Sequence, residues 1–173
     1  MKLLITGPIG SGKTTQAKII AEQFGVKLVK TGDLVRAEAA KDTPEGHQLQ
    51  QCLSTGHLAP DDIVIELVRR ELADSTDFIC DSYPRRISEL KKFDPQFEHV
   101  IYLNISDQEL EQRLLARQRA DDKPKIIEQR LKVYHAETKP LLDHYQAMGK
   151  LIEIDGHGTI EEITQRIKSA LQI

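Results

Sequence analysis

The chain has 173 residues, enough for one compact domain and short for two. Its 24 Lys and Arg against 27 Asp and Glu leave a net charge of −3, which excludes a protein held on nucleic acid by bulk positive charge. No apolar run approaches the roughly 20 residues that span a bilayer, and the apolar start MKLLITG is too short for a signal peptide. We therefore expect one cytoplasmic domain with no membrane segment and no nucleic-acid partner.

Short apolar runs alternate along the chain with longer segments of helical period. In chain order the runs are residues 3–5, 26–29, 78–80, 100–103 and 151–154. Continuous apolar runs between helices are typical of parallel strands that are buried on both faces. The pattern predicts an α/β fold, a doubly wound parallel sheet of five strands with helices on both faces.

The first predicted helix lies between the first two runs. Its apolar residues Ala17, Ile20, Ala21 and Phe24 share one face, and Gly25 is placed to end it. Residues 31–60 contain few strand signals and predict a small helical insertion.

Further helix boundaries follow in the second half of the chain. Asp121 and Asp122 stand before Pro124, a typical helix start, and Pro140 predicts a break or kink. The last helix begins with Thr159 and Glu162, spaced as a capping box. We expect this helix and the first one to pack on the sheet.

The strongest functional signal is the segment GPIGSGKT, from Gly7 to Thr14, between the first strand and the first helix. It fits G-x-x-x-x-G-K-[ST], the loop whose backbone N–H groups surround phosphate while its lysine reaches the β- and γ-phosphates. A glycine-rich turn with a surface lysine is the structural alternative. The ATP-binding residues predicted in this loop are Gly7, Gly10, Ser11, Gly12, Lys13, Thr14 and Thr15, with a hydroxyl of Thr14 or Thr15 near Mg²⁺.

Further segments beyond this loop resemble the adenylate kinases and their nucleoside-monophosphate kinase relatives. They are residues 31–36 (TGDLVR), 81–85 (DSYPR), 119–122 (RADD) and 155–156 (DG), in the family's order along essentially the whole chain. The resemblance implies reversible transfer of the γ-phosphoryl group of MgATP to AMP, giving two ADP, by a monomer. It divides the chain into a core of residues 1–30, 61–116 and 121–173, an NMP-binding insertion of residues 31–60, and a short lid at about 117–120.

The resemblance also implies roles for most of the arginines, whose rigid, permanently charged donor forks suit phosphate. The catalytic set is Lys13, Arg85, Arg117, Arg119 and Arg130. Arg113, Arg117 and Gly158 join the ATP-binding residues, with Arg113 stacked on the donor base. The AMP-binding set is Thr31, Arg36, His57, Ala59, Arg85, Glu89, Arg119 and Arg130.

Two carboxylates are candidates for the Mg²⁺ site together with Thr14. Asp81 follows an apolar strand, as a carboxylate facing the waters of a nucleotide-bound Mg²⁺ does, and Asp33 matches a second family carboxylate. The structural alternatives are a turn residue for Asp81 and a helix N-cap for Asp33. The short lid has none of the cysteines with which some relatives bind zinc, so we expect Mg²⁺ and no zinc.

Several positions depart from the family pattern. Thr14 and Ser82 each stand where glycine is usual; Thr14 either contacts Mg²⁺ or crowds the loop, and Ser82 has no assigned role. Glu89 replaces a glutamine that reads the adenine edge, and an ionised glutamate can only accept hydrogen bonds. Glu89 therefore leaves open a broader acceptor range that includes GMP, or another residue that reads the base.

Two further alternatives remain open. The chain could phosphorylate another small molecule, as the shikimate and gluconate kinases do, or it could sense nucleotide without transferring phosphate. Thr31, Arg36 and Arg85 argue against the first alternative, and the complete arginine set argues against the second.

Overall fold

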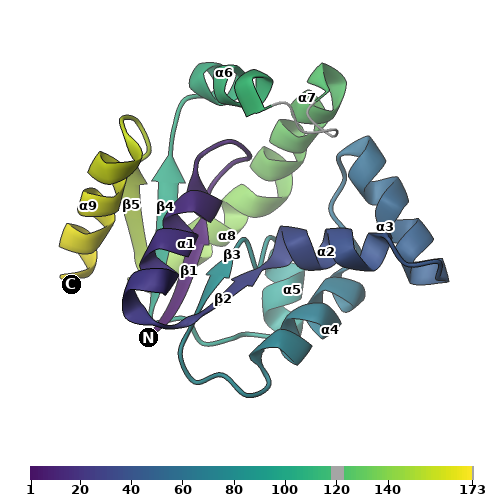
Figure 1. The fold of residues 1–173 in the computed structure, drawn as a ribbon, viewed down its shortest axis with the longest axis horizontal. Coiled ribbons are helices and arrows are strands. Elements are labelled where there is room, and N and C mark those ends of the chain that lie inside the picture. The colour runs from purple at the N-terminus through teal and green to yellow at the C-terminus, as the bar shows by residue number, and fades with distance from the viewer. Residues whose placement is uncertain (118–122, 173) are drawn as a thin grey trace.

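A computed structural model of the chain, which describes residues 1–117 and 123–172, contains one sheet of five parallel strands (Figure 1). The strands are β1 (Lys2–Thr6), β2 (Lys27–Lys30), β3 (Phe78–Asp81), β4 (His99–Asn104) and β5 (Leu151–Asp155). Their order across the sheet is β2-β3-β1-β4-β5, with β1 in the centre. The prediction of five parallel strands is confirmed, each close to its predicted position.

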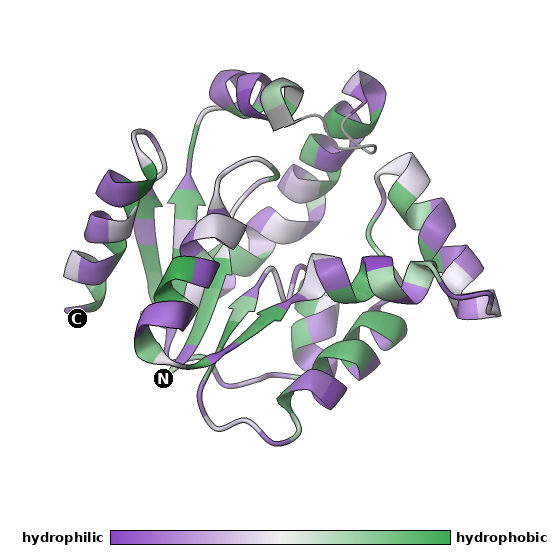
Figure 2. Ribbon diagram, viewed as in Figure 1, coloured by the Kyte–Doolittle hydropathy of each residue, from purple (hydrophilic) through white to green (hydrophobic). Residues whose placement is uncertain are grey.

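Helices cover both faces of the sheet, because alternate strand residues point to opposite sides. Leu3 and Ile5 pack with α1 (Lys13–Phe24) and α9 (Ile160–Leu171). Leu4 lies in the opposite core with α4 (Asp61–Leu72), α5 (Ile87–Lys92) and α8 (Lys139–Ala147). Figure 2 shows the strands as largely hydrophobic, while the outer sides of the helices carry hydrophilic residues.

The two helices on the first face end and begin where the sequence predicts. Gly25 is in the left-handed conformation at the end of α1, with φ of 63°. At the start of α9, the Thr159 hydroxyl accepts from the Glu162 N–H, and the Glu162 carboxylate accepts from the Thr159 N–H. Both predicted boundaries are confirmed.

Residues 31–60 form a helical projection beyond the sheet (Figure 1), as predicted. It consists of α2 (Thr31–Ala39), which begins directly at the end of β2, and α3 (Pro44–Thr55). The Thr43 hydroxyl caps α3 by accepting from the Gly46 N–H at 3.0 Å.

The described parts of the segment between β4 and β5 are mostly helical. It comprises α6 (Asp107–Arg117), α7 (Pro124–Val133), a single π-helical segment η1 (Tyr134–Thr138), and α8. Pro140 lies in the first turn of α8, directly after η1, so the predicted break takes the form of a π-turn inside one helical path. Asp121 and Asp122 and most of the predicted lid lie outside the described residues.

Candidate active site

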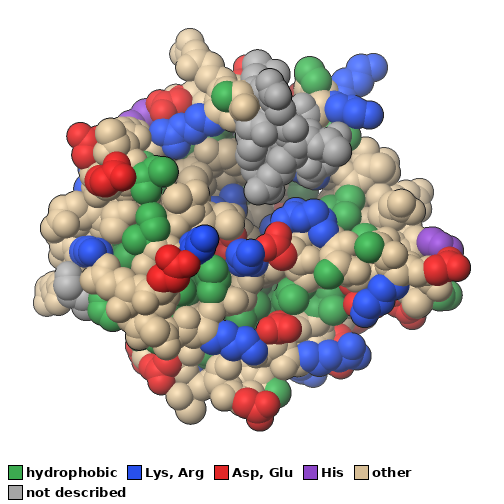
Figure 3. Space-filling view, viewed as in Figure 1, with side chains coloured by type: hydrophobic (Ala, Val, Ile, Leu, Met, Phe, Trp, Pro, Cys, Tyr) green, Lys and Arg blue, Asp and Glu red, His purple; other side chains and the backbone are tan. Residues whose placement is uncertain are grey.

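A cleft of about 280 Å³ opens at the edge of the sheet where β1 and β3 end. Its walls come from the β1–α1 loop, α2, the segment after α3, the β3–α5 loop and α7 with η1. In open parallel sheets this edge is where ligands bind. Figure 3 shows Lys and Arg side chains around the hollowed centre of this face, with acidic side chains between them. The cleft is therefore built to take anions.

The β1–α1 loop has the geometry that phosphate binding requires. A Cβ atom on Gly7 would lie 2.8 Å from the Ser11 hydroxyl and 2.9 Å from the Leu103 carbonyl oxygen, so only glycine fits there. Gly12 has φ of 89° and is the N-cap of α1, whose first N–H groups face the loop. The Lys13 Nζ donates to the Pro8 carbonyl at 3.0 Å and lines the cleft. The loop thus combines glycines at positive φ, a helix N-terminus and a lysine.

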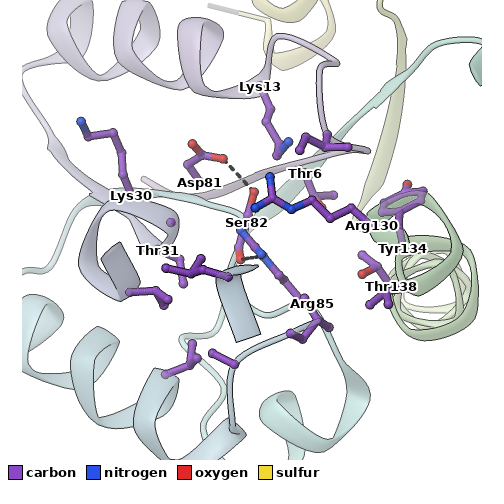
Figure 4. A pocket seen from close by; sticks show the side chains of 18 of the residues that line it. Thr6, Lys13, Lys30, Thr31, Asp81, Ser82, Arg85, Arg130, Tyr134 and Thr138 are labelled. Atoms are coloured by element: carbon purple, nitrogen blue, oxygen red, sulfur yellow. Dashed lines mark hydrogen bonds between the residues drawn. The ribbon is translucent and has the colours of Figure 1, made fainter. Parts of the chain in front are cut away.

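Asp81 is held by two hydroxyl groups at the end of β3. The Thr14 hydroxyl donates to Oδ2 at 2.5 Å. The Ser82 hydroxyl donates to Oδ1 at 2.8 Å (Figure 4). Asp81 and Ser82 are only 6% and 4% exposed, and Ser82 adopts a φ of 67°, unusual for a residue with a side chain. Thr14 and Ser82, the two residues that stand where the family usually has glycine, therefore both donate to the Asp81 carboxylate.

Asp33 lies at the mouth of the cleft, in the first turn of α2. Lys30 is the N-cap residue of that helix, so the N-cap alternative for Asp33 is wrong. The Asp33 carboxylate forms ion pairs with Lys30 and, at 2.5 Å, with Arg36. Partial burial raises the pKa of Asp33, but the hydrogen bonds from these two cations outweigh it and hold the pKa below its usual value. In this arrangement Asp33 orients Arg36.

Cationic side chains from separate elements meet in the cleft. Figure 4 shows Lys13, Arg85 and Arg130 pointing toward one another from the start of α1, the β3–α5 loop and α7. The Arg85 Nε donates to the Ser82 carbonyl at 3.1 Å, which fixes the direction of its guanidinium. Arg36 adds a further guanidinium from α2. The structure therefore brings together the described members of the predicted catalytic set, except Arg117, whose side chain is not described.

The opposite wall of the cleft has the predicted base-reading residues. Thr31 and Glu89 are buried there, and the Thr31 hydroxyl has no hydrogen-bond partner among the described residues. Ala59 lines this wall, and its carbonyl accepts from Arg86 at 3.2 Å. The exposed His57 lies at the rim, 3.3 Å from Gln129 of α7. This wall can therefore present several hydrogen-bonding groups to one flat ligand.

The remaining predicted ATP-binding residues lie outside the cleft lining. Gly10, Ser11, Gly12 and Thr15 belong to the β1–α1 loop and the first turn of α1. The Arg113 guanidinium donates to Glu109 at 2.5 Å and to the Gly156 carbonyl at 3.0 Å, which ties α6 to the loop that contains Gly158. Arg119 falls outside the described residues.

The lining residues that were not predicted as site residues include Lys30, Tyr134 and Thr138. Lys30 could have been found, because it ends β2 at the sheet edge where β1 and β3 also end. Tyr134 and Thr138 belong to the π-helical turn, which has no sequence signal other than Pro140 nearby. Burial raises the pKa of Tyr134, so its hydroxyl stays protonated at neutral pH.

A parallel α/β sheet with a phosphate loop at its first βα turn, facing arginines across a shared cleft, defines a P-loop enzyme of phosphoryl transfer between two phosphate-bearing substrates. The class follows from the site, since the fold alone supports many functions.

Comparison with known proteins identifies the family. A sequence model described as adenylate kinase matches residues 5–150. Among curated relatives, the adenylate kinase of Synechococcus sp. (strain WH7803) is 37% identical over 179 residues, covering 98% of each chain. That of Thermus thermophilus is 36% identical over 182 residues, covering 99% of this chain and 97% of its own. The chain belongs to the adenylate kinase family.

Family membership makes this chain an ATP:AMP phosphotransferase. It does not favour the alternatives of a different or broader acceptor nucleotide such as GMP, of another small acceptor, or of a nucleotide sensor without transfer activity. In the described part of the chain, no helix combines the length and the apolar content needed to cross a membrane.

Proposed function

We propose that the cleft binds MgATP on the β1–α1 loop and AMP between α2 and the β3–α5 loop, and that it transfers the γ-phosphoryl group directly between them. The observation that carries this proposal is the convergence of Lys13, Arg85 and Arg130 on one cleft (Figure 4). Two polyanions brought together in water repel each other, and a shared cationic cleft offsets that repulsion while it aligns them.

The reaction needs no general base. A phosphate oxygen of AMP, already ionised, attacks the γ-phosphorus while the bond from that phosphorus to the β–γ bridging oxygen breaks, which leaves ADP on both sides. Lys13 and the loop amides stabilise the leaving phosphates. Arg36 and Arg85 hold the acceptor phosphate, and Arg130, together with Arg119, surrounds the transferred group.

The residues around Asp81 fit a Mg²⁺ ion that arrives with the nucleotide. Mg²⁺ prefers oxygen ligands and is usually held by one or two carboxylates together with phosphates and waters. Asp81 and the Thr14 hydroxyl supply such oxygens at the carboxyl end of β3, beside the phosphate loop. We assign these two residues to the Mg²⁺ site and Asp33 to its outer edge; when bound, the ion neutralises charge on the phosphates.

Access to the cleft depends on the segments around it. The insertion of residues 31–60 already contacts α7 through His57 and Gln129. We infer that this insertion and the short lid at about 117–120 close over the substrates and exclude water, so that ATP hydrolysis without AMP is slow. The monomeric state and the cytoplasmic location remain predictions.

The direct test measures ADP formation from MgATP and AMP with the Lys13→Ala and Arg85→Ala variants. Each removes one preorganised charge and should lower kcat/KM by about 10²- to 10³-fold, or about 2.7–4 kcal/mol of transition-state stabilisation. The matched control is Arg70→Ala, because the exposed Arg70 is paired with Glu66 at 2.8 Å on α4, and Arg70 is not among the residues that line the cleft. Full activity in Arg85→Ala, with unchanged KM for AMP, would remove Arg85 from the site.

A further inference from the structure

The two carboxyl oxygens of Glu89 have different surroundings in the wall of the cleft. Its side chain is 2% exposed and lines the cleft from the first turn of α5. Its Oε2 accepts from the Arg85 N–H at 2.6 Å and from the Arg86 N–H at 3.3 Å. No described residue donates to Oε1. One oxygen therefore caps the helix, and the other is available to a ligand.

Charged groups of both signs surround Glu89, and one cation among them, Arg85, has the main effect on its ionisation. On its own turn it faces Arg85 and Arg86; α4 contributes Asp61, and Tyr83 of the β3–α5 loop also interacts with it. The Arg86 guanidinium is already paired with Asp61 at 2.8 Å, so Arg85 is the main cation that favours the ionised form. Arg85 in turn faces Arg36 of α2, Arg130 of α7 and Asp81 of β3.

Burial in this wall raises the pKa of Glu89, and it outweighs the opposing effects of the Arg85 N–H and the Arg85 charge. A phosphate dianion bound to Arg85 would offset the positive charge of Arg85, and with it the lowering of the Glu89 pKa that this charge causes. Acceptor binding therefore favours the neutral acid further.

A side chain that pairs with a ring nitrogen of adenine must donate a hydrogen bond to it. On the adenine edge, the amino group N6 is a hydrogen-bond donor, but the ring nitrogens on either side of it, N1 and N7, are acceptors. An ionised carboxylate can only accept hydrogen bonds. Placed against this edge, it can accept from N6, but its lone pairs then face those of N1 or N7. A neutral carboxyl has one O–H donor and still accepts.

We propose that Glu89 reads the adenine of AMP as a neutral carboxylic acid, so that AMP binding places a proton on Oε1, which donates to a ring nitrogen. This inference rests on the proposed position of AMP in the cleft. Oε2 continues to accept from the two backbone N–H groups, so proton uptake leaves the cap of α5 intact. Base recognition and phosphate binding are then coupled through Arg85.

The test is calorimetric titration of AMP into the wild type and Glu89→Gln, in buffers of different ionisation enthalpy, which gives the protons taken up per AMP. Glutamine keeps the acceptor for the two N–H groups and presents an N–H₂ donor, so it mimics the neutral acid without titrating. Above the pKa of Glu89 in the free enzyme, the wild type should take up about one proton more than Glu89→Gln, and its Kd should rise about tenfold per pH unit. The proton linked to the phosphate of AMP is common to both proteins and cancels. Glu66→Gln, an exposed change on α4, should behave as the wild type.

Three results would overturn the inference. The first is equal proton uptake by the wild type and Glu89→Gln. The second is loss of AMP affinity by tenfold or more in a Glu89→Gln variant that melts as the wild type does. The third is tighter binding of GMP than of AMP by the wild type, because guanine presents donors to an ionised carboxylate.

A second measurement does not need the variant to fold. The ¹³C chemical shift of the Glu89 carboxyl in the wild type, followed with and without AMP, should move to that of the neutral acid on binding; a carboxylate shift in the complex would also overturn the inference. Transfer to AMP without a Glu89-linked proton would refute only this inference, whereas absence of transfer would refute the proposed function.

Discussion

The Ser82 side chain donates a hydrogen bond to Asp81, but the Ser82 backbone adopts a strained conformation. Two substitutions at Ser82 measure the hydrogen bond and the backbone strain separately. The hydroxyl donates to Asp81 Oδ1 at 2.8 Å, while the backbone adopts a φ of 67°. Ser82→Ala removes the bond and keeps a side chain in the left-handed region. Ser82→Gly removes the same bond and relieves that strain.

The expected magnitudes follow from these contacts. A hydrogen bond to a charged group contributes about 1.5–3 kcal/mol, so Ser82→Ala should lower the free energy of unfolding by about 2 kcal/mol. The left-handed conformation costs a residue with a side chain about 1–2 kcal/mol, and glycine loses about 0.5–1 kcal/mol more than alanine in chain entropy on folding. Ser82→Gly should therefore be about 1 kcal/mol more stable than Ser82→Ala.

Urea denaturation in the presence of a chelator measures both values without Mg²⁺, and the slope m should stay constant. Ser88→Ala, an exposed change on α5, is the matched control and should stay within about 0.5 kcal/mol of the wild type. The reasoning fails if Ser82→Ala is as stable as the wild type, or if Ser82→Gly is the less stable of the two Ser82 variants.

Other predictions concern stability and pH. The Thr164 hydroxyl donates to the buried Gln16 amide oxygen at 2.8 Å, so Thr164→Val should cost about 1–3 kcal/mol in urea denaturation, and an unchanged midpoint would contradict this. A Cβ on Gly46 would lie 2.2 Å from the Lys41 carbonyl oxygen, so Gly46→Ala should destabilise the protein by about 1–3 kcal/mol, measured by thermal melting; equal melting temperatures would disprove the clash. Because the pKa of Glu89 is raised on folding, its contribution to stability is fully present below the pKa of an unfolded glutamate and is lost as pH rises through the raised value. Glu89→Gln should flatten that loss in urea titrations across this range, and identical pH profiles would contradict the shift.

The sequence predicts the sheet well because β1, β3 and most of β4 are buried on both faces, and the partly exposed edge strands β2 and β5 still contain short apolar runs. Such strands appear as continuous apolar runs, and all five were located in this way. The phosphate loop can also be predicted from local sequence, because the spacing of the motif places glycine at Gly7 and Gly12, where the backbone has positive φ. The cap formed by Thr159 and Glu162 likewise depends on neighbours in the sequence.

The hydrogen bonds and ion pairs within the site depend on how segments far apart in the sequence are aligned, which local sequence does not predict. Ile5 lies opposite Asp81 across β1 and β3, and this pairing places the phosphate loop beside the carboxylate, where Thr14 and Ser82 reach it. The partners of Asp33 depend on where α2 begins. Tyr134 enters the cleft wall from a π-turn, which local sequence does not specify.

The most direct test of the shared cleft is a crystal structure of the chain with MgADP at saturating concentration, since ADP is the product on both sides of the reaction. We predict one nucleotide with its phosphates hydrogen-bonded to the backbone of the β1–α1 loop and to Lys13, and a second with its phosphate held by Arg36 and Arg85. A second ADP bound elsewhere, with Arg36 and Arg85 making no phosphate contact, would contradict the account.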